Sequence, residues 1–333
     1  MSKWIVWFPL KTLGTALGLV GLASLALAVM LASPVTPLPE LPSISKAARA
    51  VDRSTMPPLS RFSARDGTEL AYRHYPARGP ATGKIAILVH GSSGSSVAAH
   101  GLADALAAHG VETYAPDIRG HGGSGTRGDI GFIGQLENDM EDLVTFVRKT
   151  SPTEPLTLLG HSAGGGFALR VAGSPIQDLF ARTVLLAPYL GYDAPSTRPG
   201  SGGWASADIP RFLALAALRR IGVDCCEALP VLAFAVPPNS ERFLTPTYSY
   251  RLMRNFATRS YKRDLADARH PITLISGASD ELMQADKYAD AVHAVAPSVE
   301  VRLIAGVGHM GIVGDPSGVS AVADYVANTQ TGS

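Results

Sequence analysis

The sequence predicts an α/β fold in which a mostly parallel sheet is flanked by helices. Short apolar runs that are typical of buried strands alternate with longer helical stretches along most of the chain. One strand-like run, residues 155–159, leads into Gly-His-Ser-Ala-Gly at 160–164 and then into a helix-like run at 165–172. This is a G-x-S-x-G pattern in a strand–turn–helix setting, in which a tight turn exposes the hydroxyl of Ser162.

The predicted elements follow one another along the chain. Asp66-Gly67 separates two alternating segments, 61–64 and 68–74, and predicts a hairpin with a two-residue turn. Further elements are expected as strand 85–89, helix 96–109, strand 111–115, helix 132–149, strand 156–160, helix 163–172, strand 183–187, strand 271–277, helix 284–295 and strand 299–304. Right-handed crossovers would bring the carboxyl ends of the parallel strands, and therefore Ser162, to one edge of the sheet.

Two downstream residues can supply the base and the acid that a serine nucleophile needs. A serine hydroxyl is a poor nucleophile at neutral pH unless an imidazole, itself oriented by a carboxylate, removes its proton. Asp280 follows the predicted strand 271–277, and His309 lies in a glycine-rich loop after the strand 299–304. Asp280 could instead cap a helix, and His309 could satisfy a loop hydrogen bond. Their positions after strands favour a catalytic triad with Ser162.

A second motif indicates a family. Residues 114–124, Tyr-Ala-Pro-Asp-Ile-Arg-Gly-His-Gly-Gly-Ser, resemble the D-x-R-G-H-G-x-S segment of α/β-hydrolases of the monoacylglycerol lipase, lysophospholipase and serine aminopeptidase group. The resemblance extends from about residue 60 to the carboxyl end, with one insert excluded. It implies an α/β-hydrolase fold and gives Asp117, Arg119 and His121 a structural role, so His121 is not the expected base. His161, in the variable position of the G-x-S-x-G pattern, is expected to pack beside the serine.

The same fold predicts where the oxyanion of the reaction would be bound. Such a site needs N–H donors that point at the developing charge. One donor is the backbone amide of Ala163, the residue after the nucleophile, and the other comes from the loop after the strand 85–89. In that loop, residues 90–94, Gly91 permits a sharp turn that would direct the amide of Ser92 toward the site. Ser93 is the alternative donor, and a flexible surface loop is the plain alternative.

An insert separates the strand 183–187 from the strand that precedes Asp280. Residues 189–261 are too long for a simple loop and are expected to form a mainly helical lid over Ser162. Their apolar runs, 210–218 and 231–236, would pack onto the main domain, contact an acyl chain, or do both. The two cysteines, Cys225 and Cys226, are adjacent, so they match neither a disulfide framework nor a metal site and are expected to be ordinary lid residues.

The first 33 residues are expected to anchor the protein in a membrane. Leu13 to Ala32 are mainly apolar and uncharged, and as a helix they would be about 30 Å long, enough to span a bilayer. Lys3 and Lys11 precede this run, together with Trp4, Trp7 and Phe8, which suit a membrane interface. These residues would place the amino terminus in the cytoplasm and the catalytic domain outside it. A cleaved secretory signal, with Ala26-Leu-Ala28 as a small-residue site, is the alternative, and both interpretations export the enzyme.

The remaining domain boundaries follow from composition. Residues 34–58 are rich in proline and are expected to form an extended tether. The catalytic domain would then consist of residues 59–188 and 262–333. The 333-residue chain has a formal net charge of only +1 and no basic run, which argues against a nucleic-acid partner.

These observations predict a serine hydrolase that cleaves a carboxylic ester of a lipid-like or apolar acyl substrate and needs no metal or organic cofactor. A serine aminopeptidase or amidase with the same triad is an alternative, which would use acidic residues of the insert to bind a free amino group. The available acidic residues are Asp208, Asp224, Glu227 and Glu241. A cofactor-free haloperoxidase or perhydrolase is a further alternative. A non-enzymatic binding module is disfavoured, because such proteins usually lose a triad member. The oligomeric state stays open.

Overall fold

The computed structural model describes residues 4–240 and 244–329, with side chains from residue 15 onward. Its main sheet has eight strands in the order β1-β2-β4-β3-β5-β6-β10-β11. These are β1 (Ser60–Ser63), β2 (Glu69–Tyr75), β3 (Lys84–Val89), β4 (Val111–Pro116), β5 (Leu156–His161), β6 (Arg182–Leu186), β10 (Ile272–Gly277) and β11 (Glu300–Ile304). β1 and β2 are antiparallel to each other, β2 is antiparallel to β4, and the pairs from β4 to β11 are parallel. The mostly parallel sheet is confirmed.

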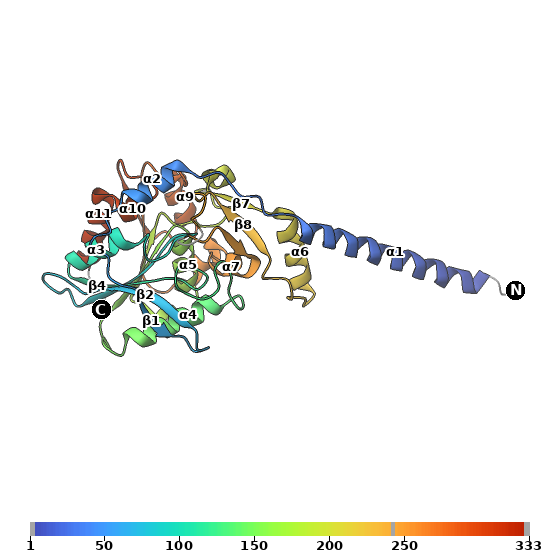
Figure 1. The fold of residues 1–333 in the computed structure, drawn as a ribbon, viewed down its shortest axis with the longest axis horizontal. Helices are drawn as coiled ribbons and strands as arrows, with labels where there is room; N and C mark the ends of the chain where they lie inside the picture. The colour runs from blue at the N-terminus through green and yellow to red at the C-terminus, as the bar shows by residue number, and fades with distance from the viewer. Residues whose placement is uncertain (1–3, 241–243, 330–333) are drawn as a thin grey trace.

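Helices cover both faces of this sheet (Figure 1). One face packs against α3 (His100–Ala108), α10 (Gly311–Gly314) and α11 (Pro316–Asn328). The other packs against α4 (Gln135–Val147), α5 (Ala163–Ala172), α8 (Tyr261–Asp267) and α9 (Tyr288–His293). Short 3₁₀ turns occur at η1 (Gln177–Leu179), η2 (Pro199–Gly203) and η3 (Ala285–Lys287). The sheet is therefore the middle of three layers, as expected for a strand–helix alternation.

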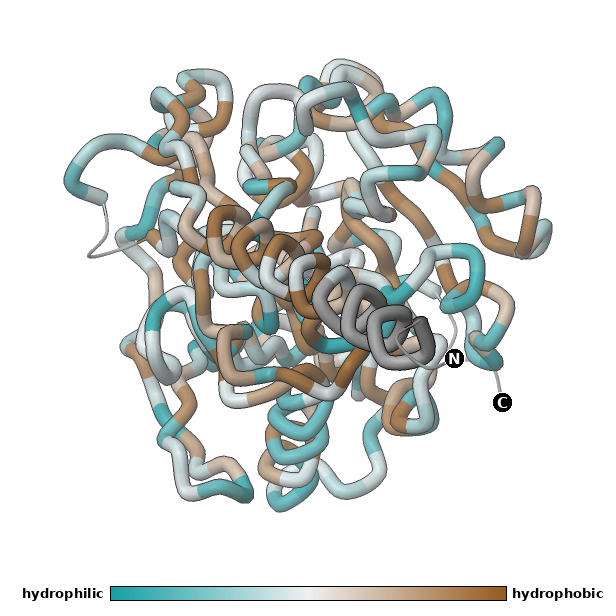
Figure 2. Tube along the Cα trace, turned by 90° about the vertical axis from the view of Figure 1, so that its right-hand side faces the viewer, coloured by the Kyte–Doolittle hydropathy of each residue, from teal (hydrophilic) through white to brown (hydrophobic). Residues whose placement is uncertain are grey.

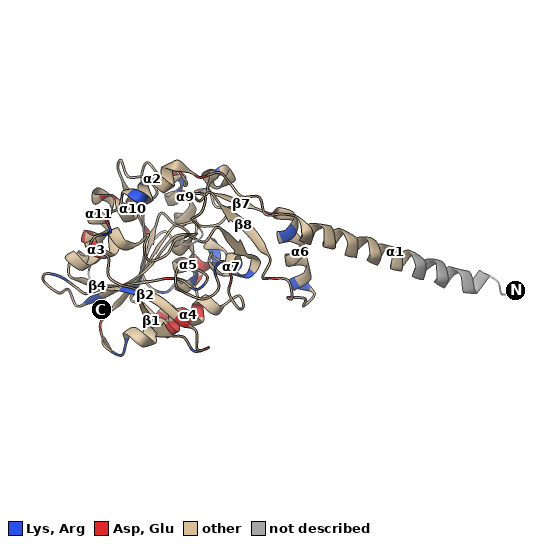
Figure 3. Ribbon diagram, viewed as in Figure 1, with Lys and Arg blue, Asp and Glu red and all other residues tan. Residues whose placement is uncertain are grey.

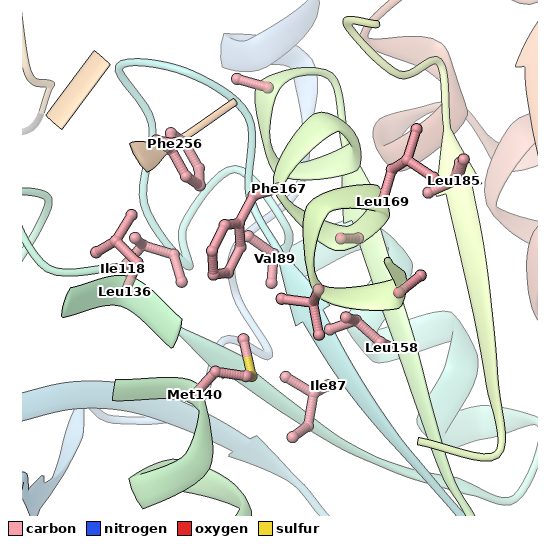
Figure 4. Packing of buried hydrophobic residues seen from close by; sticks show 14 of the residues in the cluster. Ile87, Val89, Ile118, Leu136, Met140, Leu158, Phe167, Leu169, Leu185 and Phe256 are labelled. Atoms are coloured by element: carbon pink, nitrogen blue, oxygen red, sulfur yellow. The ribbon is translucent and has the colours of Figure 1, made fainter. Parts of the chain in front are cut away.

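The continuous apolar sequence of β3 follows from burial on both faces. Ile85, Ile87 and Val89 point into the layer that contains α4 and α5, whereas Ala86 and Leu88 point into the layer that contains α3 and α11. Figure 4 shows the first of these layers, where Ile87 and Val89 lie with Phe167 of α5 and Met140 of α4. Polar and apolar residues therefore do not alternate along this strand, because both of its faces are buried.

The first hairpin has a longer turn than the sequence predicted. Its loop consists of three residues, Arg65 to Gly67, and it is closed by the Ala64 N–H, which donates to the Thr68 carbonyl at 2.9 Å. Gly67 has a φ of +80°, the left-handed conformation that three-residue loops require at their last position. The Asp66-Gly67 pair thus indicates the position of the turn correctly. The loop has three residues instead of two, and Gly67 is the last of them.

The insert, residues 189–261, contains a small sheet in addition to the expected helices. It contains α6 (Ile209–Arg220) and α7 (Tyr250–Asn255). It also contains a three-stranded antiparallel sheet of β7 (Ala205–Ala207), β8 (Pro230–Phe234) and β9 (Thr247–Ser249). Strands as short as β7 and β9 leave no period-2 pattern, and their pairing across the insert cannot be seen in a local window.

Residues 34–58 are not extended throughout. Residues 42–50 form a helix, α2 (Pro42–Ala50), which starts with Pro42 in its first turn. Its Ile44 is buried in the main core, and the N–H of Leu41 donates to the carbonyl of Ala235 in the insert at 3.1 Å. The sequence suggested a tether because proline dominates the segment, yet Pro at the start of a helix is well tolerated.

The first helix, α1 (Trp4–Ala32), projects away from the rest of the molecule (Figure 1). Its described side chains are largely exposed, including Leu17, Leu22 and Val29 at 65–66%. Within the described residues it is the one helix long and apolar enough to cross a bilayer, over Thr15–Ala32, and a secretory signal would have the same properties. Lys3 and the side chains of Trp4, Trp7, Phe8 and Lys11, which suggested its orientation, lie outside the described part of the chain.

Candidate active site

Ser162 occupies a strained turn between β5 and α5. Its φ and ψ are 55° and −119°, a conformation that is costly for a residue with a side chain. The turn is held because the Ser162 N–H donates to the Leu186 carbonyl at 2.9 Å, and the Ser162 carbonyl accepts from Tyr189 N–H at 2.9 Å. A Cβ on Gly160 would lie 2.1 Å from the carbonyl of Gly164, and one on Gly164 would lie 2.3 Å from that of His90. Both glycines of the motif are therefore required by close backbone approach.

Asp280 and His309 meet at the carboxyl edge of the sheet, as the sequence predicts. The Nδ1 of His309 lies 2.9 Å from the Oδ2 of Asp280, and both side chains are almost fully buried. The Oδ1 of Asp280 accepts from the N–H groups of Leu282 and Met283, each at 2.8 Å. Burial works against ionisation of Asp280, but the neighbouring His309 and these hydrogen bonds outweigh it, so the pKa of Asp280 is lowered. The carboxylate is thus ionised where it can orient an imidazole.

The residue before the nucleophile connects Ser162 to the His309 loop. His161 Nε2–H donates to the His309 carbonyl at 3.0 Å, and the two imidazole rings are 4.8 Å apart. Burial, reinforced by the nearby His309, lowers the pKa of His161 to about 3. A ring that stays neutral and uses its Nε2 proton to hold a carbonyl cannot serve as the general base, so His161 has the packing role that the sequence suggested.

The loop after β3 lies against the nucleophile and distinguishes the two oxyanion candidates. A Cβ on Gly91 would lie 3.2 Å from the Ser162 Cβ, so the loop and the elbow are in direct contact. The N–H of Ser93 donates to the Tyr248 hydroxyl at 2.7 Å, which occupies that amide. This arrangement favours Ser92 as the donor beside Ala163. The Oγ of Ser92 in turn accepts from the indole N–H of Trp204, in the insert, at 2.8 Å.

Two buried histidines and a tyrosine support this loop from behind. Nδ1 of His121 faces the carbonyls of Ile118 and Arg119 and therefore carries the ring proton. Nε2 of His121 is then the acceptor, so the Tyr248 hydroxyl, which accepts the Ser93 N–H, donates its own proton to this nitrogen at 2.5 Å. Nε2 of His90 accepts from the Ile118 N–H at 3.2 Å, and its Nδ1–H donates to the Gly91 carbonyl at 2.8 Å. Burial lowers the pKa of both imidazoles and raises that of Tyr248. All three groups are therefore neutral, and their hydrogen bonds fix the backbone on which Ser92 lies.

Asp117 and Arg119 have structural roles, as the resemblance implies. The two carboxylate oxygens of Asp117 accept from the N–H groups of Ser96 and Gly123, at 2.7 and 2.8 Å. Arg119 forms a two-pronged ion pair with Asp139, with N–O distances of 2.8 and 2.7 Å. These contacts join the loops at the carboxyl edge of the sheet without reaching the triad.

Replacement of Tyr248 by phenylalanine should weaken both the fold and the reaction. Tyr248→Phe leaves the Ser93 N–H and His121 Nε2 buried without a partner, and each unsatisfied group costs about 1–3 kcal/mol. We expect a lower midpoint of thermal unfolding and a reduced kcat on a short-chain nitrophenyl ester. Tyr192→Phe is the matched control, because Tyr192 is 89% exposed. An unchanged kcat in Tyr248→Phe would show that the loop does not need this support.

Three residues of the site were not found from the sequence. Glu281 accepts the backbone N–H of His309 at 2.9 Å and so holds the histidine loop; its position next to Asp280 was the only signal available. Trp204 and Tyr248 belong to the insert and contact residues 112 and 155 positions away in the chain. No local pattern links residues over such distances, because the insert brings them to the loop only after folding.

The described residues contain no group of three or more His, Cys, Asp or Glu side chains arranged to hold a metal ion. Cys225 and Cys226 are free thiols, of which Cys225 is exposed. They lie on the loop that follows α6, away from the triad in sequence.

Several known proteins resemble the chain, over lengths that differ from one to the next. The model of a family described as serine aminopeptidase, S33, matches residues 80–316. The protein Rv2715 of Mycobacterium tuberculosis, described as uncharacterized, is 26% identical over 288 residues, 80% of each chain. A monoacylglycerol lipase of Mycolicibacterium smegmatis is 36% identical over 105 residues, which are 31% of this chain and 37% of that protein. The uncharacterized protein YnbC of Escherichia coli is 32% identical over 117 residues, which are 34% of this chain but only 20% of YnbC.

Solved structures share the fold. A soluble variant of monoglyceride lipase from Saccharomyces cerevisiae, in complex with a substrate analogue, superposes with a TM-score of 0.61 at 17% identity, over 83% of this chain and 95% of that one. At this identity the similarity concerns the fold alone.

Proposed function

Because the chain belongs to the serine aminopeptidase S33 family and has the α/β-hydrolase fold, we propose that it is a serine hydrolase that cleaves carboxylic esters of lipid-like or other apolar acyl groups. The observation that supports this most strongly is the hydrogen bond between His309 and Asp280, on a loop that bonds to His161, the residue before the strained Ser162. A strained serine next to an oriented imidazole is the arrangement that nucleophilic catalysis needs.

The proposed reaction proceeds through an acyl-enzyme. Nε2 of His309 accepts the Ser162 hydroxyl proton while Oγ attacks the ester carbonyl, and Asp280 stabilises the imidazolium that forms. The amides of Ala163 and Ser92 bind the oxyanion, and His309 then gives its proton to the departing alcohol. A water molecule, deprotonated by His309, attacks the acyl-enzyme, and collapse of this second intermediate returns the proton to Ser162 and releases the acid.

The side chains that the insert presents to the site favour an apolar substrate. Trp204 contacts Phe234 with a ring separation of 5.7 Å, and Phe234 lies edge-on to Tyr248 at 4.6 Å. These three aromatic residues stand next to the oxyanion loop, since Trp204 and Tyr248 both hydrogen-bond to it. Ser162 is only 6% exposed. We therefore propose that the insert is a lid and that it must move to admit the acyl chain.

An aminopeptidase activity is less well supported, although the family description includes it. That activity requires acidic side chains that are free to bind an α-amino group. The carboxylate of Asp208 accepts from Ser33 Oγ at 2.8 Å, and that of Glu227 forms an ion pair with Arg219. Glu241 lies outside the described residues, and Asp224 is exposed on a loop. Two of the four candidates are thus engaged elsewhere.

A substrate panel on the full-length protein tests ester against amide preference. In detergent micelles, kcat/KM should be at least about 100-fold higher for a monoacylglycerol than for an aminoacyl anilide. The free amino group of the anilide would find no hydrogen-bond or ion-pair partner in an apolar site, and discrimination of this size is normal in such a case. Lysophospholipid and a short nitrophenyl ester complete the panel, and the short ester controls for intact chemistry. A higher kcat/KM for the anilide would replace the esterase proposal by the aminopeptidase one. Halide-dependent peroxide consumption would indicate the haloperoxidase alternative.

We further propose that α1 is retained as a membrane anchor, with the catalytic domain outside the cytoplasm. Its length, its composition and the exposure of its described side chains support this. A cleaved signal would remove the helix, so the mass of the mature protein in a membrane fraction distinguishes the two.

A further inference from the structure

The end of α1 is fastened to the insert by one arginine. Arg211, which is 7% exposed, donates from Nε to the carbonyl of Leu31 at 2.9 Å and from Nη1 to that of Pro230 at 2.7 Å. Its Nη2 donates to the carbonyl of Ser33. The last carbonyls of a helix have no partner within the helix, and they lie at the negative end of its dipole. A buried guanidinium therefore satisfies and neutralises the end of α1.

Asp208 joins the same junction from the start of α6. Its carboxylate caps α6 by accepting the Arg211 N–H at 3.1 Å, and it accepts from the Ser33 hydroxyl at 2.8 Å. Leu31 also packs against the small cluster of Leu215 and Val231. The polar and apolar contacts together make the end of α1 and the beginning of α6 one packed unit.

Beside this junction the insert exposes large apolar side chains. Apart from those of α1, the described part of the chain has eight exposed large hydrophobic residues: Leu59, Phe132, Tyr192, Ile209, Leu213, Ile221, Val223 and Leu303. Four of the eight, Ile209, Leu213, Ile221 and Val223, lie within fifteen consecutive residues on α6 and the loop after it, and their exposed fractions are 55, 52, 73 and 39%. We call these four residues the α6 surface. Ile209 and Leu213 are four residues apart and therefore lie on the same side of the helix.

The junction sets the depth of the α6 surface relative to a bilayer. The candidate span ends at Ala32, one residue before Ser33, so an element packed against Leu31 and Ser33 lies at the boundary between hydrocarbon and water. Figure 1 shows α6 running across the carboxyl-terminal end of α1. Figure 2 shows this face of the molecule from the side of the amino terminus, with apolar segments beside that end of α1. An apolar helix face at this depth would be in contact with lipid.

The charges nearby are those expected at a lipid headgroup layer. The described part of α1 has no charged side chain, whereas α6 ends with the exposed Arg219 and Arg220 (Figure 3). Arg219 is paired with Glu227, so Arg220 is the residue of the two that would reach a lipid phosphate. Helices that lie in a membrane interface combine an apolar face with basic residues that reach phosphate groups. If the α6 surface bound a second protein, it would have no reason to lie at the level where α1 leaves the bilayer. Its position there therefore favours lipid as the partner.

We infer that the α6 surface docks into the headgroup region of the same leaflet from which α1 emerges, and that the Arg211–Asp208 junction holds it there. This inference rests on the proposed retention of α1 as a membrane anchor. It makes the insert, which also contacts the oxyanion loop through Trp204 and Tyr248, a lipid-bound part of the enzyme. An apolar ester in that leaflet would then meet the insert without first entering the aqueous phase.

Site-specific fluorescence in vesicles tests the docking. Cys225 and Cys226 are replaced by serine in the full-length chain, and a bimane label is attached to a single cysteine at position 213, 221 or 303 in phosphatidylcholine–phosphatidylglycerol vesicles. Leu303 is the matched control, because it is an exposed leucine on the edge strand β11. Labels at 213 and 221 should be quenched by lipids brominated near the headgroup and be at least about three-fold less accessible to iodide than the label at 303. Equal iodide access at all three positions would overturn the inference.

Two further measurements separate docking from anchoring and from catalysis. Arg211→Met should reduce lipid quenching at position 213 while the protein stays in the membrane after carbonate extraction. Loss of the protein from the membrane would instead contradict the anchor.

Leu213→Asp should reduce hydrolysis of a vesicle-embedded monoester several-fold and leave hydrolysis of a dissolved short ester unchanged. If the unmodified protein cleaves neither ester, the proposed function fails while the quenching result still decides the docking. Iodide shielding without lipid quenching would show that a second copy covers the surface, against this inference.

Discussion

Ser162→Ala should lower kcat on a short-chain nitrophenyl ester by a factor on the order of 10⁶, the scale of loss when the nucleophile of a triad is removed. Without Oγ no acyl-enzyme can form, whereas the elbow should keep its shape because alanine fits the space of serine. The variant should also stop reacting with a fluorophosphonate probe, which labels activated serines.

The control for this experiment is Ser317→Ala, since Ser317 is exposed on α11. It should retain full activity and full labelling. Thermal unfolding of Ser162→Ala should occur close to the midpoint of the unmodified protein, because alanine keeps the same backbone conformation and the same strain. An enzyme that lacked the Ser162 hydroxyl yet kept its activity would exclude the proposed mechanism altogether.

Asp280→Asn should reduce kcat/KM by a factor on the order of 10⁴, through the wrong histidine tautomer. The backbone amides of Leu282 and Met283 both donate to one oxygen of Asp280, so an asparagine must place its oxygen there. Its NH₂ group then faces Nδ1 of His309 and forces the imidazole proton onto Nε2. An Nε2 that already has a proton cannot accept the one from Ser162. Esterase assays at neutral pH measure this loss.

Asp286→Asn is the matched control, because its carboxyl group is 74% exposed on the turn that follows.

The pH dependence of the stability offers a second measurement of the role of Asp280. The pKa of Asp280 is lowered from 3.8, so its contribution to the free energy of unfolding is fully present above this value and is lost as pH falls through the lower folded-state pKa. The difference in stability between the unmodified protein and Asp280→Asn should therefore be constant near neutral pH and shrink in acid. A constant difference down to the lowest pH would show that Asp280 is not stabilised as an anion.

The main sheet could be predicted from the sequence because its information is local. Each parallel strand is a short apolar run of its own, and the strained elbow has a motif that spans five residues. Asp280 and His309 could be found for the same reason, since each follows a strand directly. The small sheet of the insert could not be predicted, because β8 is stabilised by β7 and β9, which are three residues long and lie on either side of it in the chain.

The same limit applies to the candidate site. Sequence reasoning left Ser92 and Ser93 as equal neighbours in a flexible-looking loop. What favours one of them is the hydroxyl of Tyr248, which lies 155 positions away and takes the Ser93 amide. Helix α2 was missed for a related reason, because a proline-rich segment becomes helical here only where Ile44 finds a buried place in the core.

The packing of α2 changes how far the catalytic domain can reach. A fully extended segment of residues 34–58 would be roughly 80 Å long and would let the domain sample a wide volume beyond a membrane. With α2 held on the core and Leu41 bonded to Ala235, that freedom is lost. If α1 is retained as the membrane anchor that we propose, an enzyme held in this way meets its substrates by diffusion in two dimensions. Its turnover in a cell would therefore follow the surface density of the ester rather than its concentration in solution.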